Sequence, residues 1–291
     1  MRNDFAIFIL THGRANNVYT KKTLNTLGYS GRLYYIIDNE DEQADEYYSK
    51  YGDAVIMFDK PKSAEWVDAG DNFGKRTCIL YARNVCFRIA KELGLKYFMQ
   101  LDDDVSDIQW RWAENGKLKG KKAIPFDDIC EAFIEWLEDS DADTVAFCQG
   151  GDFIGGVNGS YGKGLLRKAM NSFFCRTDRP IEFKGTMNED VSMYTNYGNR
   201  GRLIMSSTKL CLVLLATQSV AGGMTEEYKE TGTYIKSFYS VMISPHAVKI
   251  GYLADGHAKA ADDNIRVHHS IDWNRTAVKV LREEVRKERD F

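Results

Sequence analysis

Short apolar runs recur through the N-terminal part of the chain and predict buried strands. Residues 5–10, 32–38, 54–59 and 97–101 each form a mostly apolar run with polar residues at or beside its end. Nearly continuous runs of this length are typical of strands that are covered on both faces, because a strand with one solvated face would alternate. These four segments are therefore expected to form the centre of a sheet.

Two amphipathic stretches separate these runs. Residues 16–28 predict a helix with Asn16 or Asn17 as its N-cap and Gly28 at its end. Residues 76–94 predict a second helix with one apolar face, made of Ile79, Ala82, Cys86, Ala90 and Leu93. The order strand, helix, strand, strand, helix, strand predicts a mostly parallel, doubly wound α/β sheet.

The rest of the chain continues this α/β character with more elaborate connections. Seven glycines among the fifteen residues 150–164 predict a flexible or closely packed loop. No internal repeat, low-complexity tract or linker is visible, so residues 1–291 are expected to form one domain. The other expected elements are a basic hairpin or loop at 108–126, a helix at 127–140, a strand at 144–149, one or two strands at 202–216, and helices at 189–198, 225–245 and 274–291.

The composition is that of an ordinary globular protein. Hydrophobic residues make up 44% of the 291 positions and charged residues 28%, which argues against a disordered chain. A formal net charge of -3 argues against a general coat of nucleic acid, but not against local basic patches. Six scattered cysteines without a CxxC pair indicate reduced, buried thiols. Because no apolar run is long enough for a signal peptide or a membrane span, a soluble, cytoplasmic protein is expected.

Three consecutive carboxylates follow the strand at 97–101. Asp102, Asp103 and Asp104 would repel one another unless a cation or hydrogen-bond donors lie among them. Mg²⁺ and Mn²⁺ take oxygen ligands, commonly one or two carboxylates together with substrate phosphates. Asp102 and Asp104 alternate along an extended chain and can share one face, while Asp103 points elsewhere. We favour a metal site over the alternative, a solvated acidic turn.

Polar residues also follow the first two predicted strands. Thr11 and Arg14 belong to the loop after 5–10, and Asp38 ends the second strand. Ligands of open α/β sheets bind at the carboxyl ends of the strands, where an arginine can contact a base and an aspartate can accept from base or ribose. The chain has no GxGxxG after the first strand and no GxxxxGK[ST], so a dinucleotide fold or a P-loop is unsupported.

The predicted helix before the acidic triplet carries two polar residues among apolar neighbours. A buried arginine at Arg83 needs an anion as its partner, and Asn84 offers both a donor and an acceptor. The alternative is an arginine whose stem reaches solvent.

Two further polar groups lie late in the chain. A carboxylate such as Asp190 or Glu189, placed opposite a metal-bound leaving group, could act as a general base. The alternative is that Asn188 caps a helix with an acidic first turn, and both can hold together. A neutral imidazole of His268 or His269 could complete a metal site made of carboxylates, although a histidine pair is more often structural.

Taken in order, these motifs resemble those of GT-A fold nucleotide-sugar glycosyltransferases. The segment THGR resembles the base-binding first loop, DNE the second-strand loop, YARN the helix motif, LDDDV the DxD motif, NED the acidic acceptor-side motif and VHH the late metal-binding histidine. The resemblance covers residues 5–270. It is closest to the TET/JBP-associated glycosyltransferases, found largely in phages, through THGR, ARN, LDDD, NED and a terminal HHSIDW.

The resemblance implies a GT-A-like fold with a nucleotide-binding half at about 1–105 and an acceptor-side, metal-completing half at about 106–291. It implies that Mn²⁺ or Mg²⁺ bridges Asp102 or Asp104 to the diphosphate of a UDP-sugar, with His268 or His269 completing the metal shell. The metal would stabilise the charge that develops on the leaving diphosphate. The residues expected to hold the nucleotide are Thr11, Arg14, Asp38, Arg83, Asn84, Asp102 and Asp103.

The resemblance also implies the reaction and the acceptor. Asp190, with Glu189 as the second choice, would deprotonate the acceptor hydroxyl for a direct, inverting displacement that transfers a hexose or an N-acetylhexosamine. The acceptor implied by the narrower family is a hydroxymethylated pyrimidine in DNA, such as 5-hydroxymethylcytosine, which for a phage-encoded enzyme is met in the host cytoplasm.

Support for DNA from the residues themselves lies in the segment 110–122. Its two tryptophans and five lysines and arginines suit base stacking together with phosphate contact. The alternative is a solvated lysine loop over a buried Trp110. Other functions that the sequence leaves open are the same transfer to a protein, lipid or small acceptor, a nucleotidyltransferase that releases pyrophosphate, and a non-enzymatic nucleotide-sugar or DNA-binding module.

Overall fold

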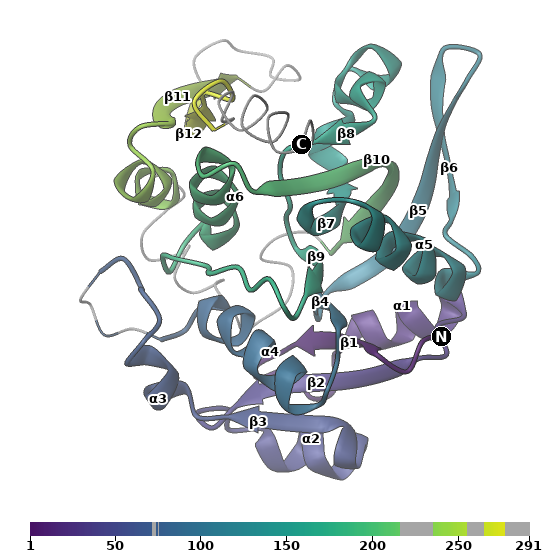
Figure 1. Ribbon diagram of the computed structural model, residues 1–291, viewed down its shortest axis with the longest axis vertical. Coiled ribbons are helices and arrows are strands. Elements are labelled where there is room, and N and C mark those ends of the chain that lie inside the picture. The colour runs from purple at the N-terminus through teal and green to yellow at the C-terminus, as the bar shows by residue number, and fades with distance from the viewer. Residues whose placement is uncertain (72–73, 75, 216–234, 255–264, 277–291) are drawn as a thin grey trace, which may run out of the picture.

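A mixed ten-stranded sheet forms the centre of the molecule (Figure 1). The computed structural model describes residues 1–71, 74, 76–215, 235–254 and 265–276. The strands follow the order β3-β2-β1-β4-β9-β7-β10-β5-β6, with β8 paired to β10. They are β1 (Phe5–Leu10), β2 (Arg32–Asp38), β3 (Val55–Phe58), β4 (Tyr97–Asp102), β5 (Val105–Glu114), β6 (Lys117–Lys122), β7 (Ala142–Gln149), β8 (Leu165–Leu166), β9 (Ser172–Arg176) and β10 (Leu203–Leu214).

The direction of the strands changes from the first half of the chain to the second. Strands β1, β2, β3 and β4 are mutually parallel, as predicted. Strand β9 runs antiparallel to both β4 and β7, whereas β7 and β10 are parallel. The hairpin of β5 and β6 joins the sheet antiparallel to β10. The α/β class is therefore confirmed, with a parallel first half, β1 to β4, and a mixed second half.

Helices cover both faces of this sheet. Alternate residues of β1 enter two separate cores, Phe5, Ile7 and Ile9 on one face and Ala6, Phe8 and Leu10 on the other. Every side chain of β1 is buried, which explains its unbroken apolar run. The first face is covered by α1 (Tyr19–Leu27), α2 (Ala44–Tyr51) and α5 (Phe126–Asp139), and the second by α4 (Leu80–Glu92) and α6 (Glu189–Asn199).

Some predicted elements differ from those in the structure. Helix α2 was not predicted, because its only buried residue is Tyr47 and its tyrosines and charges show no clear period. Helix α1 begins at Tyr19, and its N-cap is Val18 instead of Asn16 or Asn17. The glycine-rich segment forms three short 3-10 turns, η2 (Gly150–Phe153), η3 (Gly156–Asn158) and η4 (Ser160–Lys163). Segment 202–216 contributes one long strand, β10.

Two predicted helices extend outside the described residues. Of the helix predicted at 225–245, residues 235–243 are helical and 225–234 lie outside the described part. Most of the helix predicted at 274–291 also lies outside it. A separate two-stranded sheet, β11 (Val248–Ala254) and β12 (Ile265–Ile271), lies at the opposite side of Figure 1 from the hairpin. A short helix, α3 (Lys60–Ala64), follows β3.

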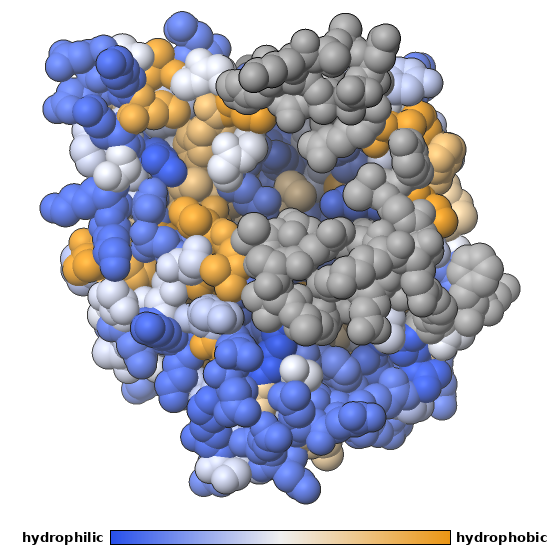
Figure 2. Space-filling model, turned by 180° about the vertical axis from the view of Figure 1, so that it is seen from behind, coloured by the Kyte–Doolittle hydropathy of each residue, from blue (hydrophilic) through white to orange (hydrophobic). Residues whose placement is uncertain are grey.

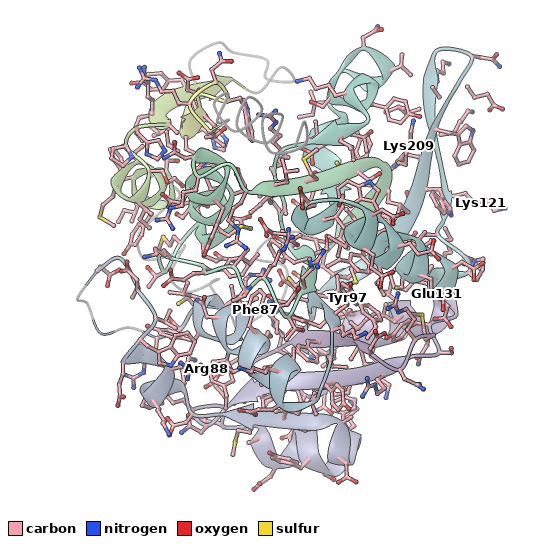
Figure 3. All side chains as sticks on the ribbon, in the orientation of Figure 1. Phe87, Arg88, Tyr97, Lys121, Glu131 and Lys209 are labelled. Atoms are coloured by element: carbon pink, nitrogen blue, oxygen red, sulfur yellow. The ribbon has the colours of Figure 1, made fainter. Side chains whose placement is uncertain are left out.

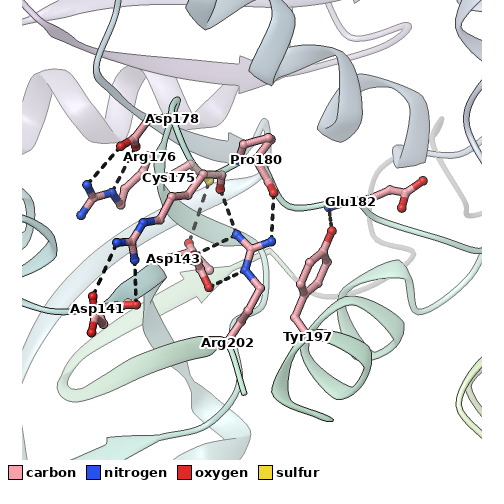
Figure 4. Close-up of polar contacts among 12 residues, drawn as sticks. Asp141, Asp143, Cys175, Arg176, Asp178, Pro180, Glu182, Tyr197 and Arg202 are labelled. Atoms are coloured by element: carbon pink, nitrogen blue, oxygen red, sulfur yellow. Dashed lines mark hydrogen bonds and ion pairs between the residues drawn. The ribbon is translucent and has the colours of Figure 1, made fainter. Parts of the chain in front are cut away.

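A polar network fastens the segment that leads from β9 to α6 (Figure 4). Arg202 donates two hydrogen bonds of 2.8 Å to the carboxylate of Asp143 on β7, and a third of 3.3 Å to the carbonyl of Pro180. The hydroxyl of Tyr197 on α6 accepts a hydrogen bond of 2.8 Å from the backbone amide of Glu182. These contacts fix the approach to α6, and with it the carboxylates at the start of that helix.

The molecular surface differs between the two ends. Viewed from behind, the lower end, where β2, β3 and α2 lie, is covered mainly by hydrophilic residues (Figure 2).

Within the described residues, no helix combines the length and the apolar character that crossing a bilayer requires. The six cysteines are free and buried, as predicted.

Candidate active site

The acidic triplet lies at the carboxyl end of β4, in the turn that leads directly to β5. Thr20 of α1 holds this turn through three hydrogen bonds. Its hydroxyl donates to the carbonyl of Asp102 and accepts from the backbone of Val105 at 3.0 Å, and its backbone amide donates to the carbonyl of Asp103 at 3.1 Å. The turn is thus held by backbone contacts that leave the three carboxylates available for other partners.

The three carboxylates have different surroundings. Asp103 accepts hydrogen bonds of 2.7 Å from Arg14 Nη1 and 2.7 Å from the Thr11 hydroxyl. Asp102 accepts from Arg83 Nη2 at 2.9 Å. Among the described residues, Asp104 Oδ1 has no hydrogen-bond partner although that atom is buried. Asp103 therefore has partners of its own. The predicted alternation along an extended chain is wrong, because Asp103 and Asp104 lie in the turn between β4 and β5, where the charge of Asp103 acts directly on Asp104.

This arrangement concentrates negative charge. Burial and the neighbouring charges of Asp104 and Glu189, against the opposing effect of Arg83, together raise the pKa of Asp102 to about 7. The pKa values of Asp103 and Asp104 are also raised, mainly by burial. A cation among the carboxylates would offset this repulsion. The buried, unpaired Oδ1 of Asp104 fits such a cation.

The described residues do not by themselves assemble a complete metal shell. Within the described ranges, no group of three or more His, Cys, Asp or Glu side chains converges to hold a metal ion. A hard divalent cation held by one or two carboxylates takes its other ligands from water and substrate phosphates. Asp102 and Asp104 fit that binding mode.

We expect Mn²⁺ together with UDP to stabilise the protein through Asp104. At 100-fold excess over Kd, binding stabilises the folded state by about 2.7 kcal/mol, or roughly 4 to 5 °C in Tm for a chain of 291 residues. Asp104→Asn should abolish most of this shift, while Asp53→Asn, at an exposed carboxylate of the same type, should retain it. Thermal unfolding with and without Mn²⁺ measures both. An unchanged shift in Asp104→Asn would exclude Asp104 as a ligand.

Arg83 joins the acidic triplet to the start of α6. Its Nη2 donates to Asp102 at 2.9 Å, and its Nε donates to Glu189 at 3.0 Å. The side chain is 2% exposed, and its guanidinium lies 4.8 Å from the ring centre of Phe173 and 5.8 Å from that of Phe183. The predicted need of this arginine for an anion is confirmed, and two carboxylates meet it.

Glu189 and Asp190 differ in spite of being neighbours. Glu189 is paired with Arg83, whereas Asp190 Oδ1 accepts a hydrogen bond of 2.7 Å from the backbone of Val191. Burial and the charge of Glu189 raise the pKa of Asp190 to about 6, with Arg83 and Lys236 acting in the opposite direction. Asp190 is thus a stronger base than an ordinary aspartate and is still ionised at neutral pH.

Asn188 holds the start of α6 to the C-terminal elements. It occupies the predicted N-cap position, but its side chain makes no capping hydrogen bond and its φ is 53°. Its carboxamide nitrogen instead donates to the carbonyl of Lys236 at 2.8 Å and to the Ser240 hydroxyl at 2.9 Å. The capping role is therefore wrong, because the side chain is used to fasten helix 235–243.

The two histidines lie beside Asn188. His269 Nδ1 is 3.4 Å from Asn188 Nδ2, and the rings of His268 and His269 stack at 4.3 Å. Burial and the positive neighbours His268, Lys236 and Lys168 lower the pKa of His269 to about 4, so its imidazole is neutral. Helix α6 links the histidines to the triplet: Asn188 lies beside His269, and Glu189 is joined to Asp102 through Arg83.

The loops after β1 and β2 meet as expected, but their polar groups are already paired. Asp38 Oδ2 accepts from His12 Nδ1 at 2.8 Å and from Lys60 Nζ at 3.2 Å. Asp41 Oδ2 accepts from the backbone of Gly13 at 2.8 Å. Sequence reasoning missed Lys60 and Asp41, although Lys60 follows the third strand and the same edge-of-sheet rule could have found it.

Three other expected nucleotide contacts are engaged within the protein. The Thr11 hydroxyl contacts Asp103 and lies 2.7 Å from the Tyr47 hydroxyl, and Arg14 is ion-paired with Asp103. Asn84 clamps Phe183, accepting from its amide at 3.0 Å and donating to its carbonyl at 3.0 Å. These side chains hold the walls of the site, and a direct contact with a nucleotide stays a prediction for each.

Comparison with known proteins supplies the family. The sequence model of the TET-Associated Glycosyltransferase family matches residues 5–223, well over half of the chain. No curated protein shows significant sequence similarity to the chain. Several solved structures also resemble it, among them the following two. The glucosyl-3-phosphoglycerate synthase from Mycobacterium tuberculosis in complex with Mg²⁺ and UDP is 8% identical, over 92% of this chain and 87% of that chain, with a TM-score of 0.45. S. aureus TarS 1-349 is 15% identical, over 82% of this chain and 65% of that chain, with a TM-score of 0.40. On the strength of the family match, the chain belongs to the TET-associated glycosyltransferases.

Proposed function

We propose that this glycosyltransferase moves a sugar from a UDP-sugar to the hydroxyl of a hydroxymethylated pyrimidine in DNA, in a metal-dependent reaction that inverts the sugar carbon. One observation supports this location of the active site. Arg83 contacts both Asp102 and Glu189, so the acidic triplet and the carboxylates of α6 lie on two sides of one buried cation. Family membership supplies the reaction class.

Asp102 and Asp104 are the residues that would hold the metal and, through it, the donor diphosphate. A divalent metal in this position supplies Lewis-acid stabilisation of the leaving group. The neutral imidazole of His269, or the ring of His268 stacked on it, is the candidate for completing the shell. In this proposal residues 1–105 bind the nucleotide and residues 106–291 provide the acceptor side.

Asp190 is the general base of the proposed reaction. Because Glu189 is held by Arg83, Asp190 is the neighbour left to accept a proton. The acceptor hydroxyl gives its proton to the Asp190 carboxylate while its oxygen forms the bond to the sugar carbon. The bond from that carbon to the diphosphate breaks, and the diphosphate leaves with the electron pair. One displacement of this kind inverts the carbon.

Nucleoside mass spectrometry tests the whole proposal. We expect DNA containing 5-hydroxymethylcytosine, incubated with the protein, Mn²⁺ and a panel of UDP-sugars, to gain the mass of a hexose or an N-acetylhexosamine on the modified nucleoside. Asp104→Asn should lose the gain and Asp53→Asn should keep it. UDP release without any gain on DNA would refute the acceptor, and transfer of a nucleotide with release of pyrophosphate would refute the reaction.

A further inference from the structure

The hairpin of β5 and β6 extends from the body of the molecule (Figure 1). Its turn consists of Asn115 and Gly116 with φ values of 50° and 73°, the pairing that a tight two-residue hairpin turn requires. Residues 112–117 are all exposed. The side chains at this end of the hairpin are therefore accessible to a partner.

The two faces of the hairpin differ in composition. Trp110 lies opposite Lys121, and Trp112 lies opposite Lys119. Since side chains alternate along a strand, these four residues share one face, which we call the stacking face. Trp110 is 38% exposed and Trp112 is 39% exposed, so the alternative of a buried Trp110 is wrong. Figure 3 shows Lys121 directed away from the body of the protein.

The opposite face anchors the hairpin. The guanidinium of Arg111 lies 5.5 Å from the ring centre of Phe153 in η2. Arg111 therefore holds β5 against the glycine-rich segment and leaves the stacking face to solvent. The orientation of the two tryptophans is fixed by the sheet to which β5 belongs.

The charge of the hairpin is opposite to that of the chain. Between Gln109 and Lys122 there are five lysines and arginines and one acidic residue, Glu114, giving an excess of four positive charges in a chain whose net charge is -3. Lysines beside exposed aromatic rings suit a strand of nucleic acid, because phosphates pair with the lysines and every base has a face that can stack.

We propose that the stacking face binds an unpaired stretch of DNA strand next to the acceptor base. This inference rests on the proposed function for its ligand. Unpaired bases are required because a ring can stack on a base only where the base face is accessible. Trp110 and Trp112 lie five and seven residues along β5 from Val105, which directly follows Asp104. At about 3.4 Å per residue, this is roughly 17 and 24 Å, or at most about five to seven nucleotide steps, because an unpaired strand is no more closely spaced than the 3.4 Å of a duplex.

Fluorescence anisotropy of a labelled single-stranded oligonucleotide that carries 5-hydroxymethylcytosine tests this binding. We expect each of Trp110→Ala and Trp112→Ala to weaken binding by roughly 5- to 150-fold, the range found for loss of one stacked base. The phenylalanine variants should retain most of it, because they keep an aromatic face. Lys119→Ala/Lys121→Ala should lower the slope of log affinity against log salt by about 1.4, from 0.7 for each phosphate contact.

Lys122→Ala is the matched control, because Lys122 adjoins Lys121 but lies on the opposite face. Equal losses in Lys121→Ala and Lys122→Ala would overturn the stacking face in favour of general charge. Oligonucleotides with only one nucleotide on either side of the modified base are too short to reach Trp110 and should bind the wild type and the tryptophan variants alike. Tighter binding of duplex than of single strand, or hairpin-dependent binding to phosphatidylserine vesicles without oligonucleotide binding, would also overturn the proposal.

Different results would refute the glycosylation of DNA and the binding of DNA by the stacking face. Hairpin-dependent oligonucleotide binding without any sugar transfer would support the stacking face and refute the glycosylation of DNA. Sugar transfer to DNA with unchanged KM in the tryptophan variants would support the enzyme and refute the stacking face. In the expected result, the tryptophan variants raise KM for the oligonucleotide and leave KM for the UDP-sugar unchanged.

Discussion

Asp190→Asn is expected to lower kcat for sugar transfer by about 10²- to 10⁴-fold, the contribution of a positioned general base. The asparagine keeps the size of the side chain and an oxygen that can accept from the backbone of Val191, so the fold of α6 should persist. What it loses is the ability to take the proton of the acceptor hydroxyl. Steady-state kinetics with a hydroxymethylated oligonucleotide measures the loss, and a decrease of less than tenfold would exclude Asp190 as the base.

The pH profile of the wild type gives a second readout of the same residue. The charged groups around Asp190 are Glu189, Arg83 and Lys236, and together with burial they place its pKa at about 6. Because the base acts when ionised, kcat/KM should fall as the pH decreases through about 6. Glu189→Gln removes the negative neighbour that raises this pKa, so the acidic limb should move to lower pH. If the acidic limb of the profile does not move in Glu189→Gln, the titrating group is not Asp190.

Arg83→Ala is expected to lower the free energy of unfolding by about 3–5 kcal/mol, the cost of removing one partner from buried ion pairs. The change leaves Asp102 and Glu189 without their guanidinium partner in a place where carboxylates already raise one another's pKa. It also removes a large, buried side chain from between Phe173 and Phe183. Urea denaturation at neutral pH measures the difference.

Arg88→Ala provides the control from the same helix (Figure 3). Arg88 is exposed and lies 3.8 Å from the ring centre of Trp66, a contact whose loss should cost less than about 1 kcal/mol. If both variants lost equal stability, Arg83 would not be the link between the acidic triplet and α6. Arg83→Lys keeps the positive charge but loses the planar guanidinium that donates to both carboxylates. Its loss in free energy of unfolding should lie between those of Arg83→Ala and Arg88→Ala.

Much of the fold follows from the linear pattern. Buried strands such as β1 and β4 reveal themselves because both of their faces are covered, which requires an unbroken apolar run. The turn at Asn115 and Gly116 is also determined by the local sequence, because few residue types other than Asn and Gly adopt the positive φ values of such a turn. Helix α2 escaped prediction because a single buried tyrosine produces no periodic signal.

The position of the candidate site was also predictable, but the roles of its residues were not. Parallel strands end at one edge, so the sequence alone brings Asp38, Arg14 and the acidic triplet to the same region. It does not show that Asp38 is paired with Lys60, or that Asp103 is paired with Arg14. Those pairings depend on loops that approach one another only when the sheet has formed.

The sequence by itself determined the α/β class, the parallel strands β1 to β4 and the edge at which the carboxylates gather. It did so because burial and chain direction impose local patterns of polar and apolar residues. Only the tertiary structure distinguished Glu189 from Asp190, left Asp104 Oδ1 unpaired among the described residues, and placed His269 beside Asn188. Adjacent carboxylates are chemically equivalent in a sequence, and they acquire different pKa values and partners only when distant segments such as α4 and α6 pack around them.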